Sequence, residues 1–244
     1  MINKCILLAA GMGTRLMPIT NHTPKCLIKI KGKPLLEYWL ELIQKHGITE
    51  VLINTHHLHK QVTEYIKSMP STSLKITLSH EHDLLGSYST VVHNSSYYKD
   101  DESILVANTD NLTNANLSQF FENHFSNAYG ATIALFRAKN PAECGIVEMD
   151  LQNKIIGFEE KPSYPKSNLS NAGIYVFDTK LLKELEDKSP SLDIGKSFLP
   201  RLIGKSSGYF LNEFLLDIGS HTSLKAANKL PIEFLKDSKS EFSL

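Results

Sequence analysis

The chain has 244 residues, of which 41% are hydrophobic and 21% charged, enough to bury a substantial core in one large domain. Lys plus Arg and Asp plus Glu each number 26, so the formal net charge is zero and no basic field indicates a nucleic-acid or membrane partner. Three scattered cysteines are too few for a disulfide framework or a zinc site, which favours a reducing, cytoplasmic compartment. We also expect no signal peptide and no membrane span.

The first half of the chain alternates strand and helix patterns. Strands are expected over 6–10, 51–55, 74–79 and 104–108, and helices over about 35–46, 59–68 and 117–125. Strands separated by helices imply right-handed crossovers and a mostly parallel sheet, in which ligands bind at the carboxyl ends of the strands. The glycine loop after Ala10, the segment 108–110 and the loop 81–87 are all expected at that edge.

The second half is richer in strand patterns. Strands are expected over 132–137, 145–150, 154–159, 173–177 and 214–218, and helices over about 179–186, after a capping Asp193, and over about 221–229. The predicted fold class is α/β, with a Rossmann-like, mostly parallel central sheet flanked by helices and a smaller β-rich portion in the second half. Residues 1–230 are expected to form a single domain, followed by a C-terminal tail, 231–244, with few apolar residues.

The strongest motif is CILLAAGMGTRLMPITNHTPK, residues 5–25. A buried strand passes into a glycine turn, and Arg15 and Lys25 follow, which is a layout suited to a polyphosphate. Backbone N–H groups of small residues can approach phosphates there; the candidates are Ala9, Ala10, Gly11, Gly13 and Thr14. A glycine turn alone can be structural. The segment is not a dinucleotide fingerprint, because Leu16 stands where the third glycine belongs, and it lacks the Gly-Lys-Ser/Thr of a P-loop.

Two stretches, LAAGMGTRLMPIT and TPKCLIKIKGKPLLEY, resemble the signature of the sugar-1-phosphate nucleotidyltransferases. The resemblance implies transfer of a nucleoside monophosphate from a nucleoside triphosphate to a sugar 1-phosphate, with release of pyrophosphate. It implies one such domain over 1–230, with 1–125 mainly nucleotide-binding and 126–230 mainly sugar-phosphate-binding. Arg15 would then face the leaving pyrophosphate, and Lys25 would bridge the α-phosphate and the incoming phosphate.

Two aspartates are the predicted metal ligands. Asp110 follows the strand ILVAN, and Asp217 ends the strand FLLD. Carboxylates beside phosphate oxygens suit Mg²⁺, the expected cofactor, and the family carries metal-binding aspartates in both contexts. Asp110 could instead be a turn residue, and Asp217 a helix cap. Thr109 departs from the Gly-Asp that the family has here.

Glu160, Lys161 and Asn171 are the predicted sugar-phosphate-binding residues. They lie in FEEKP and NAGIY, which match the family's Glu-Lys-Pro element and the strand after it. The resemblance implies that Lys161 meets the phosphate, while Glu160 and Asn171 contact the sugar. On its own, a Glu-Lys pair at a strand end is more often a solvated surface pair.

The segment HEHDLLGS, residues 80–87, resembles the family's base-reading loop. Glu81, Gly86 and Ser87 are the predicted nucleotide-binding residues here. A carboxylate at Glu81 suits the N–H donors of guanine, or of cytosine, better than uracil or thymine, and this favours GTP. Tyr88 could narrow the base pocket or face the core of the helix that it begins.

Other interpretations stay open. The sequence is also compatible with a cytidylyltransferase or uridylyltransferase acting on another phosphorylated molecule, such as phosphocholine or an amino-sugar phosphate. A non-catalytic sugar-nucleotide-binding protein disagrees with the presence of Arg15, Lys25, Asp110 and Asp217. A Rossmann-type oxidoreductase would need the fingerprint that is missing. The expected partners are a nucleoside triphosphate and a sugar 1-phosphate, and an exposed apolar strand in the second half could support a homo-oligomer.

Overall fold

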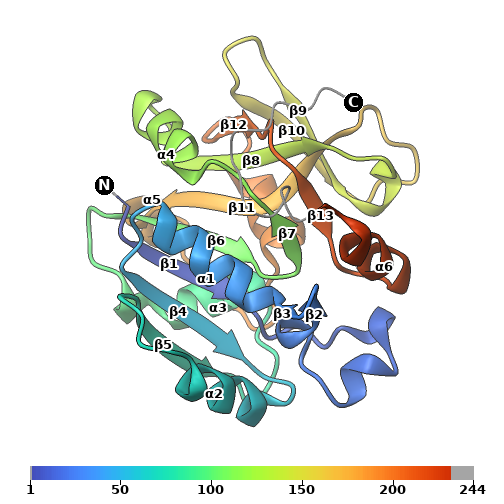
Figure 1. The fold of residues 1–244 in the computed structure, drawn as a ribbon. Helices are drawn as coiled ribbons and strands as arrows, with labels where there is room; N and C mark the ends of the chain where they lie inside the picture. The colour runs from blue at the N-terminus through green and yellow to red at the C-terminus, as the bar shows by residue number, and fades with distance from the viewer. Residues whose placement is uncertain (1, 232–244) are drawn as a thin grey trace. The chain divides into compact units, whose positions relative to one another are not determined.

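The structure is a computed structural model that describes residues 2–231 (Figure 1). The fold is α/β with a mixed set of parallel and antiparallel strand pairs flanked by helices, as the sequence predicts. Almost all of the expected C-terminal tail, from residue 232 onward, lies outside the described residues. The described chain divides into two compact units: unit 1 holds 2, 85–106 and 117–212, and unit 2 holds 3–84, 107–116 and 213–231.

Unit 2 contains a run of neighbouring parallel strands. Strands β1 (Lys4–Leu8), β4 (Glu50–Thr55) and β5 (Lys75–His80) pair in that order, all parallel. Helix α1 (Leu35–Lys45) buries the side chains of one face, including Trp39, and lies in front of β1 and β4 in Figure 1. Helix α2 (His59–Ser68) has the bounds that the sequence predicts. The carboxyl ends of the three strands therefore meet at one edge, as expected of a parallel sheet.

Short elements complete unit 2. Strand β7 (Asn111–Thr113) pairs antiparallel with β13 (Leu215–Asp217), and β2 (Lys29–Ile30) pairs with β3 (Lys33–Pro34). Helix α6 (His221–Lys229) has its predicted bounds and begins with a capping box. A buried apolar cluster joins these elements; it comprises Ile30, Leu35, Leu112, Ile218 and Ala227. Of these short elements, β2, β3 and β7 are not expected from the sequence, because two or three residues show no periodicity.

Unit 1 is built on a largely antiparallel group of strands. The long strand β11 (Leu169–Asp178) pairs antiparallel with β8 (Ala131–Arg137) and β9 (Gly145–Met149). Strand β10 (Ile155–Glu160) extends the group beyond β9, and β12 (Ser207–Phe210) runs parallel to β8. Strand β6 (Ser103–Asn108) begins in unit 1 and ends in unit 2. β11 starts at Leu169 rather than at the predicted Gly173, because a register shift between Asn171 and Tyr175 interrupts its alternation.

The helices of unit 1 are short. They are α3 (Ser87–His93), α4 (Leu117–Ser126) and α5 (Thr179–Glu184). Asp193 is the helix cap that the sequence predicts, and its side chain accepts the N–H groups of Gly195 and Lys196. That helix is only a π-helical turn, 194–198, followed by a 3₁₀ turn with Pro200 near its start. Within residues 2–231, no helix is long and apolar enough to cross a membrane.

Candidate active site

The predicted site residues form two groups, one within each unit. Unit 2 contains the residues predicted to bind phosphate, to bind a metal or, at Glu81, to contact the base. They are Ala9, Ala10, Gly11, Gly13, Thr14, Arg15, Lys25, Glu81, Asp110 and Asp217. Unit 1 contains the remaining nucleotide and sugar candidates: Gly86, Ser87, Glu160, Lys161 and Asn171.

The glycine turn after β1 is held in a conformation that needs glycine. Gly13 has a φ of 63°, and a Cβ there would lie 2.7 Å from Thr20 Cγ2. The buried Thr20 hydroxyl donates to the Gly13 carbonyl at 2.9 Å, which fixes the turn from seven positions further along the same motif. At Gly11, by contrast, a Cβ would meet no atom of the described chain within 4 Å. The backbone at Gly11 is therefore open to a ligand, as a phosphate-binding turn requires.

Lys25 and Asp110 lie in direct contact. The Lys25 ammonium is 2.7 Å from Asp110 Oδ2, and 12% of the Lys25 side chain and 33% of the Asp110 side chain are exposed. Thr109, where the family has glycine, is buried, and both its N–H and its hydroxyl donate to the Leu8 carbonyl. This pair of hydrogen bonds ties the end of β6 to the end of β1 and explains how a threonine is accommodated beside Asp110.

Asp217 lies next to Asp110 because of strand pairing. In the β7–β13 ladder Asp217 stands opposite Asn111, and the N–H of Ile218 donates to the Asp110 carbonyl at 2.8 Å. Helix α6 is capped by Ser220, so Asp217 is not its cap. A Cβ at Gly219 would overlap the Asp217 carboxylate and lie 2.6 Å from an Arg15 guanidinium nitrogen. Glycine at 219 thus leaves room for Arg15 and Asp217 together.

The donor atoms of this group suit a divalent cation that is bound together with phosphate oxygens. Burial, and then the negative charge of Asp110, raises the pKa of Asp217, while the positive charges of Lys25 and Arg15 oppose that rise. Two carboxylates, of which Asp217 has a raised pKa, are a donor set that Mg²⁺ accepts when phosphate oxygens and water complete its shell. Among residues 2–231, no group of three or more His, Cys, Asp or Glu side chains is arranged to hold a metal. Two aspartates alone would leave the shell of Mg²⁺ incomplete, so water and phosphate oxygens would supply its other ligands.

Glu81 is placed directly after β5 and is only 3% exposed. Its Oε1 accepts a 2.8 Å hydrogen bond from the Asn54 amide, and its backbone N–H donates to the Thr55 carbonyl. The sequence reasoning missed Asn54, because a single asparagine inside a buried strand carries no motif.

Gly86 and Ser87 begin helix α3 in unit 1. Gly86 has a φ of 86°, and a Cβ there would lie 2.5 Å from the Leu192 carbonyl oxygen. The Ser87 hydroxyl donates to the Asp193 carboxylate at 2.9 Å and accepts from the Ile194 N–H. Tyr88 is buried, and its ring stacks on that of Phe198 with the ring centroids 4.3 Å apart. Tyr88 therefore faces the core.

Glu160 and Lys161 lie at the end of β10. Glu160 Oε2 is close to two glycine backbones, since a Cβ on Gly145 or Gly195 would lie 2.8 or 2.9 Å from it. Lys161 has a left-handed φ of 49°, and its ammonium is 3.9 Å from Glu160 Oε1. Glu160 differs from an ordinary surface carboxylate, because burial raises its pKa against the lowering effect of Lys161, while the Lys161 side chain is exposed.

Asn171 is held at the register shift of β11. Its amide nitrogen donates to the Tyr175 hydroxyl at 2.8 Å, and its oxygen accepts the Gly173 N–H. Two charged residues missed by the sequence analysis, Asp193 and Lys196, also act on Glu160: Asp193 raises its pKa and Lys196 lowers it. Their local sequence, LDIGKSF, gave only a helix-cap signal.

Replacing Glu160 with glutamine is expected to stabilise the protein at neutral pH. A carboxyl whose pKa is raised by folding favours the folded state at low pH, and this contribution is lost as the pH rises through the folded-state pKa. Glutamine removes the charge, so the melting temperature at pH 7 should exceed that of the wild type, and the difference should shrink towards pH 4. Glu159→Gln, at the neighbouring exposed position, serves as the control. A melting temperature below wild type at pH 7 would contradict this account.

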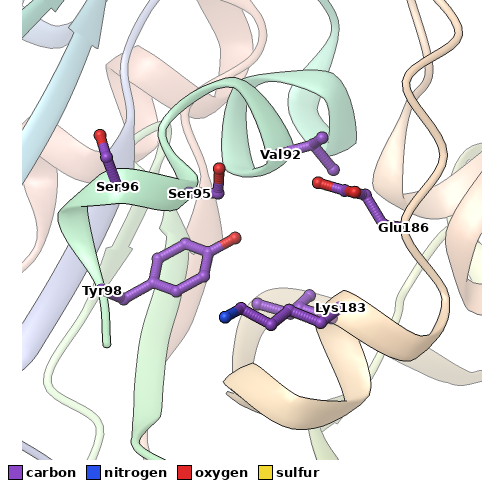
Figure 2. A pocket seen from close by; sticks show the side chains of 7 residues that line it. Val92, Ser95, Ser96, Tyr98, Lys183 and Glu186 are labelled. Carbon is purple, nitrogen blue, oxygen red and sulfur yellow. The ribbon is translucent and has the colours of Figure 1, made fainter. Parts of the chain in front are cut away.

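A separate pocket in unit 1 contains none of the predicted site residues. It encloses about 400 Å³ between α3, α5 and the turn after α3 (Figure 2). Lys183 and Glu186 point into this region, but each already contacts an opposite charge. The Lys183 ammonium pairs with the Asp100 carboxylate, and Glu186 Oε2 lies 3.4 Å from Lys188 Nζ. The remaining lining residues are Val92, Ser95, Ser96, Tyr98 and Leu182.

The fold and the unit 2 group together define an α/β protein with a glycine turn, two cations and paired carboxylates at strand ends. A family model described as nucleotidyl transferase matches residues 4–232, and the chain belongs to this family. The resemblance inferred from the motifs is thereby confirmed.

Several known proteins are similar to this chain over most of its length. It is 33% identical over 230 residues to a bifunctional protein GlmU of Methanocaldococcus jannaschii, covering 92% of this chain and 53% of that protein. It is 26% identical to the mannose-1-phosphate guanylyltransferase catalytic subunit beta of Dictyostelium discoideum, covering 98% and 67%. The structure of a putative glucose-1-phosphate thymidylyltransferase from Bacillus anthracis superposes with a TM-score of 0.83 at 26% identity, covering 97% of both chains. The chain thus spans about half the length of the GlmU relative.

Proposed function

We propose that this chain transfers a nucleoside monophosphate from a nucleoside triphosphate to a sugar 1-phosphate, giving a nucleoside diphosphate sugar and pyrophosphate. The observation that supports this most strongly is the grouping of Arg15, Lys25, Asp110 and Asp217 beside an open glycine turn. The relatives named for guanylyl and thymidylyl transfer to sugar phosphates support the same reaction class. A sugar nucleotide made in this way would supply the synthesis of cell-surface polysaccharides.

The reaction requires positioning and charge stabilisation rather than a strong base. An oxygen of the sugar phosphate, already an anion, forms a bond to the α-phosphorus, and the bond from that phosphorus to the β-phosphate oxygen breaks. The electron pair leaves with pyrophosphate. In this proposal Arg15 stabilises the leaving pyrophosphate, and Lys25 binds both the α-phosphate and the incoming phosphate. Asp110 and Asp217 would hold Mg²⁺, and the bound ion would supply positive charge beside the phosphate oxygens.

The other predicted site residues are assigned to binding the nucleotide or the sugar phosphate. Backbone groups of Ala9 to Thr14, with Gly86 and Ser87, bind the nucleotide, and Glu160, Lys161 and Asn171 bind the sugar phosphate. The division into a nucleotide part, 1–125, and a sugar-phosphate part, 126–230, belongs to this proposal, as do a homo-oligomer and a cytoplasmic location. A carboxylate at Glu81 makes GTP the preferred triphosphate, because guanine offers two adjacent N–H donors.

A substrate panel tests the choice of base. Pyrophosphate release is measured with four nucleoside triphosphates against mannose, glucose, heptose and amino-sugar 1-phosphates. Glu81→Gln is expected to raise the KM for GTP by about tenfold, within the range of one bidentate base contact, and to leave the KM for other triphosphates nearly unchanged. Preference of the wild-type chain for UTP or dTTP would refute the role of Glu81 while leaving the transfer reaction standing.

A further inference from the structure

Asn54, near the carboxyl end of β4, lies between the two loops assigned to the nucleotide. Its side chain is 3% exposed. Its Oδ1 accepts the N–H of Ala9 at 2.6 Å, and its Nδ2 donates to Glu81 Oε1 at 2.8 Å. One side chain thus joins the residue that follows β1 to the residue that follows β5, across the strand that separates them.

The chemistry of the partners fixes the orientation of this amide. A backbone N–H can only donate, so Oδ1 must face Ala9, and this leaves Nδ2 to donate to Glu81. Aspartate would supply the acceptor for Ala9 but not the donor for Glu81. Leucine would supply neither and would leave buried polar groups without these contacts. An amide is the side chain that meets both requirements at this position.

The residues around Asn54 hold the same two loops through backbone groups. The Thr55 carbonyl accepts the N–H of Glu81 at 2.8 Å, and a ring nitrogen of His56 lies 2.9 Å from the Glu81 carbonyl. On the other side, His57 Nε2 lies 2.7 Å from the Thr20 carbonyl, and the Thr20 hydroxyl holds Gly13. Because a carbonyl oxygen only accepts, each histidine nitrogen in these contacts carries the proton.

We propose that Asn54 is a positioning residue that couples the phosphate-binding turn to the base-reading carboxylate. The inference rests on the proposed function, in which the turn after Ala9 meets the triphosphate and Glu81 reads the base; the N–H of Ala9 itself is taken by Asn54. Asn54 touches neither the substrate nor the reacting atoms in this account. It fixes the N–H of Ala9 and the carboxylate of Glu81 in one geometry, so that disturbing either loop disturbs the other.

The first test measures the Ala9 hydrogen bond directly. Amide hydrogen exchange at Ala9, followed by NMR, should be at least about tenfold faster in Asn54→Ala than in the wild type, because the acceptor is gone. In the same variant the KM for the nucleoside triphosphate should rise about tenfold, the loss expected for a hydrogen bond to a charged group, with a smaller change in kcat. Asn3→Ala, at an exposed asparagine just before β1, should change neither quantity.

A second pair of variants keeps the inference testable if Asn54→Ala does not fold. Asn54→Asp places a carboxylate against Glu81, and the two negative charges repel one another when both groups are ionised at high pH. Its KM defect should therefore be large at pH 8 and should shrink as the pH falls and one proton bridges the pair. The double variant Asn54→Asp with Glu81→Gln reverses donor and acceptor, and it should recover the melting temperature and the Ala9 protection of the wild type.

The outcomes separate the positioning role from the proposed function. Unchanged Ala9 exchange and unchanged KM in Asn54→Ala, or a double variant no more stable than Asn54→Asp alone, would overturn the positioning role. A wild-type chain that protects Ala9 but releases no pyrophosphate with any sugar 1-phosphate would overturn the proposed function instead, and the coupling of the two loops would stand.

Discussion

Replacing Lys25 with alanine is expected to lower kcat by about 10²–10³-fold, the loss typical of removing one group that stabilises transition-state charge. The Lys25 ammonium lies 2.7 Å from the Asp110 carboxylate, beside the glycine turn, and in the proposed reaction it binds both the α-phosphate and the incoming phosphate. The KM for the triphosphate should change much less than kcat, because the contact is strongest in the transition state. Steady-state pyrophosphate release measures both quantities.

Lys29→Ala is the matched control for this variant. Lys29 is an exposed lysine in the neighbouring short strand β2, and the same charge is removed there without contact to the carboxylates. The control should retain wild-type kcat and melting temperature. Near-normal turnover in Lys25→Ala, or an equal loss in Lys29→Ala, would contradict the assignment of Lys25 to the reaction.

Replacing Asp217 with asparagine is expected to reduce metal-dependent turnover by about 10²-fold or more, since even indirect metal partners contribute 10–100-fold. The same variant should be more stable than the wild type at pH 7 in the presence of a chelator. The neighbouring protein and the charge of Asp110 raise the pKa of Asp217, so its ionised form disfavours folding above that pKa, and the penalty disappears as the pH falls. The gain should be modest, because part of the side chain reaches solvent.

Thermal denaturation at pH 7 and pH 4, with and without Mg²⁺, measures the stability effect. Mg²⁺ should raise the melting temperature of the wild type and have little effect on Asp217→Asn. Asp101→Asn serves as the control, because Asp101 is exposed and asparagine tolerates its left-handed φ of 58°. An Asp217→Asn protein that is less stable than the wild type at pH 7, or equally active, would rule out this account of the carboxylate pair.

The local sequence predicts the helices and strands that are long enough to show a hydrophobic periodicity. Helices α2 and α6 have their predicted bounds, and β4, β5 and β6 differ from prediction by a residue at one end or both. Asp193 was predicted as a cap because a carboxylate before a helical turn has few other local partners. The turn that follows is short, since the proline at position 200 interrupts helical hydrogen bonding.

The contacts that join distant segments could not be predicted in this way. The β7–β13 ladder brings together Asp110 and Asp217, which lie 107 positions apart in the chain (217 − 110). The local sequence of neither segment predicts that these two strands pair. Asn54 shows the same limit, because its two partners lie just after the neighbouring strands β1 and β5, 45 positions before it and 27 after it in the chain. Pairing of this kind is decided by burial and by hydrogen bonds over the whole unit, which a motif does not encode.

The most direct test of the central claim is whether pyrophosphate release depends on the second substrate. The full chain is incubated with Mg²⁺ and GTP, with and without a sugar 1-phosphate, and pyrophosphate and nucleotide sugar are quantified together. The account predicts that both products appear in equal amounts, and only when Mg²⁺ and a sugar 1-phosphate are present. Pyrophosphate or phosphate release that is the same without sugar 1-phosphate, or no release with any triphosphate and sugar 1-phosphate of the panel, would contradict it.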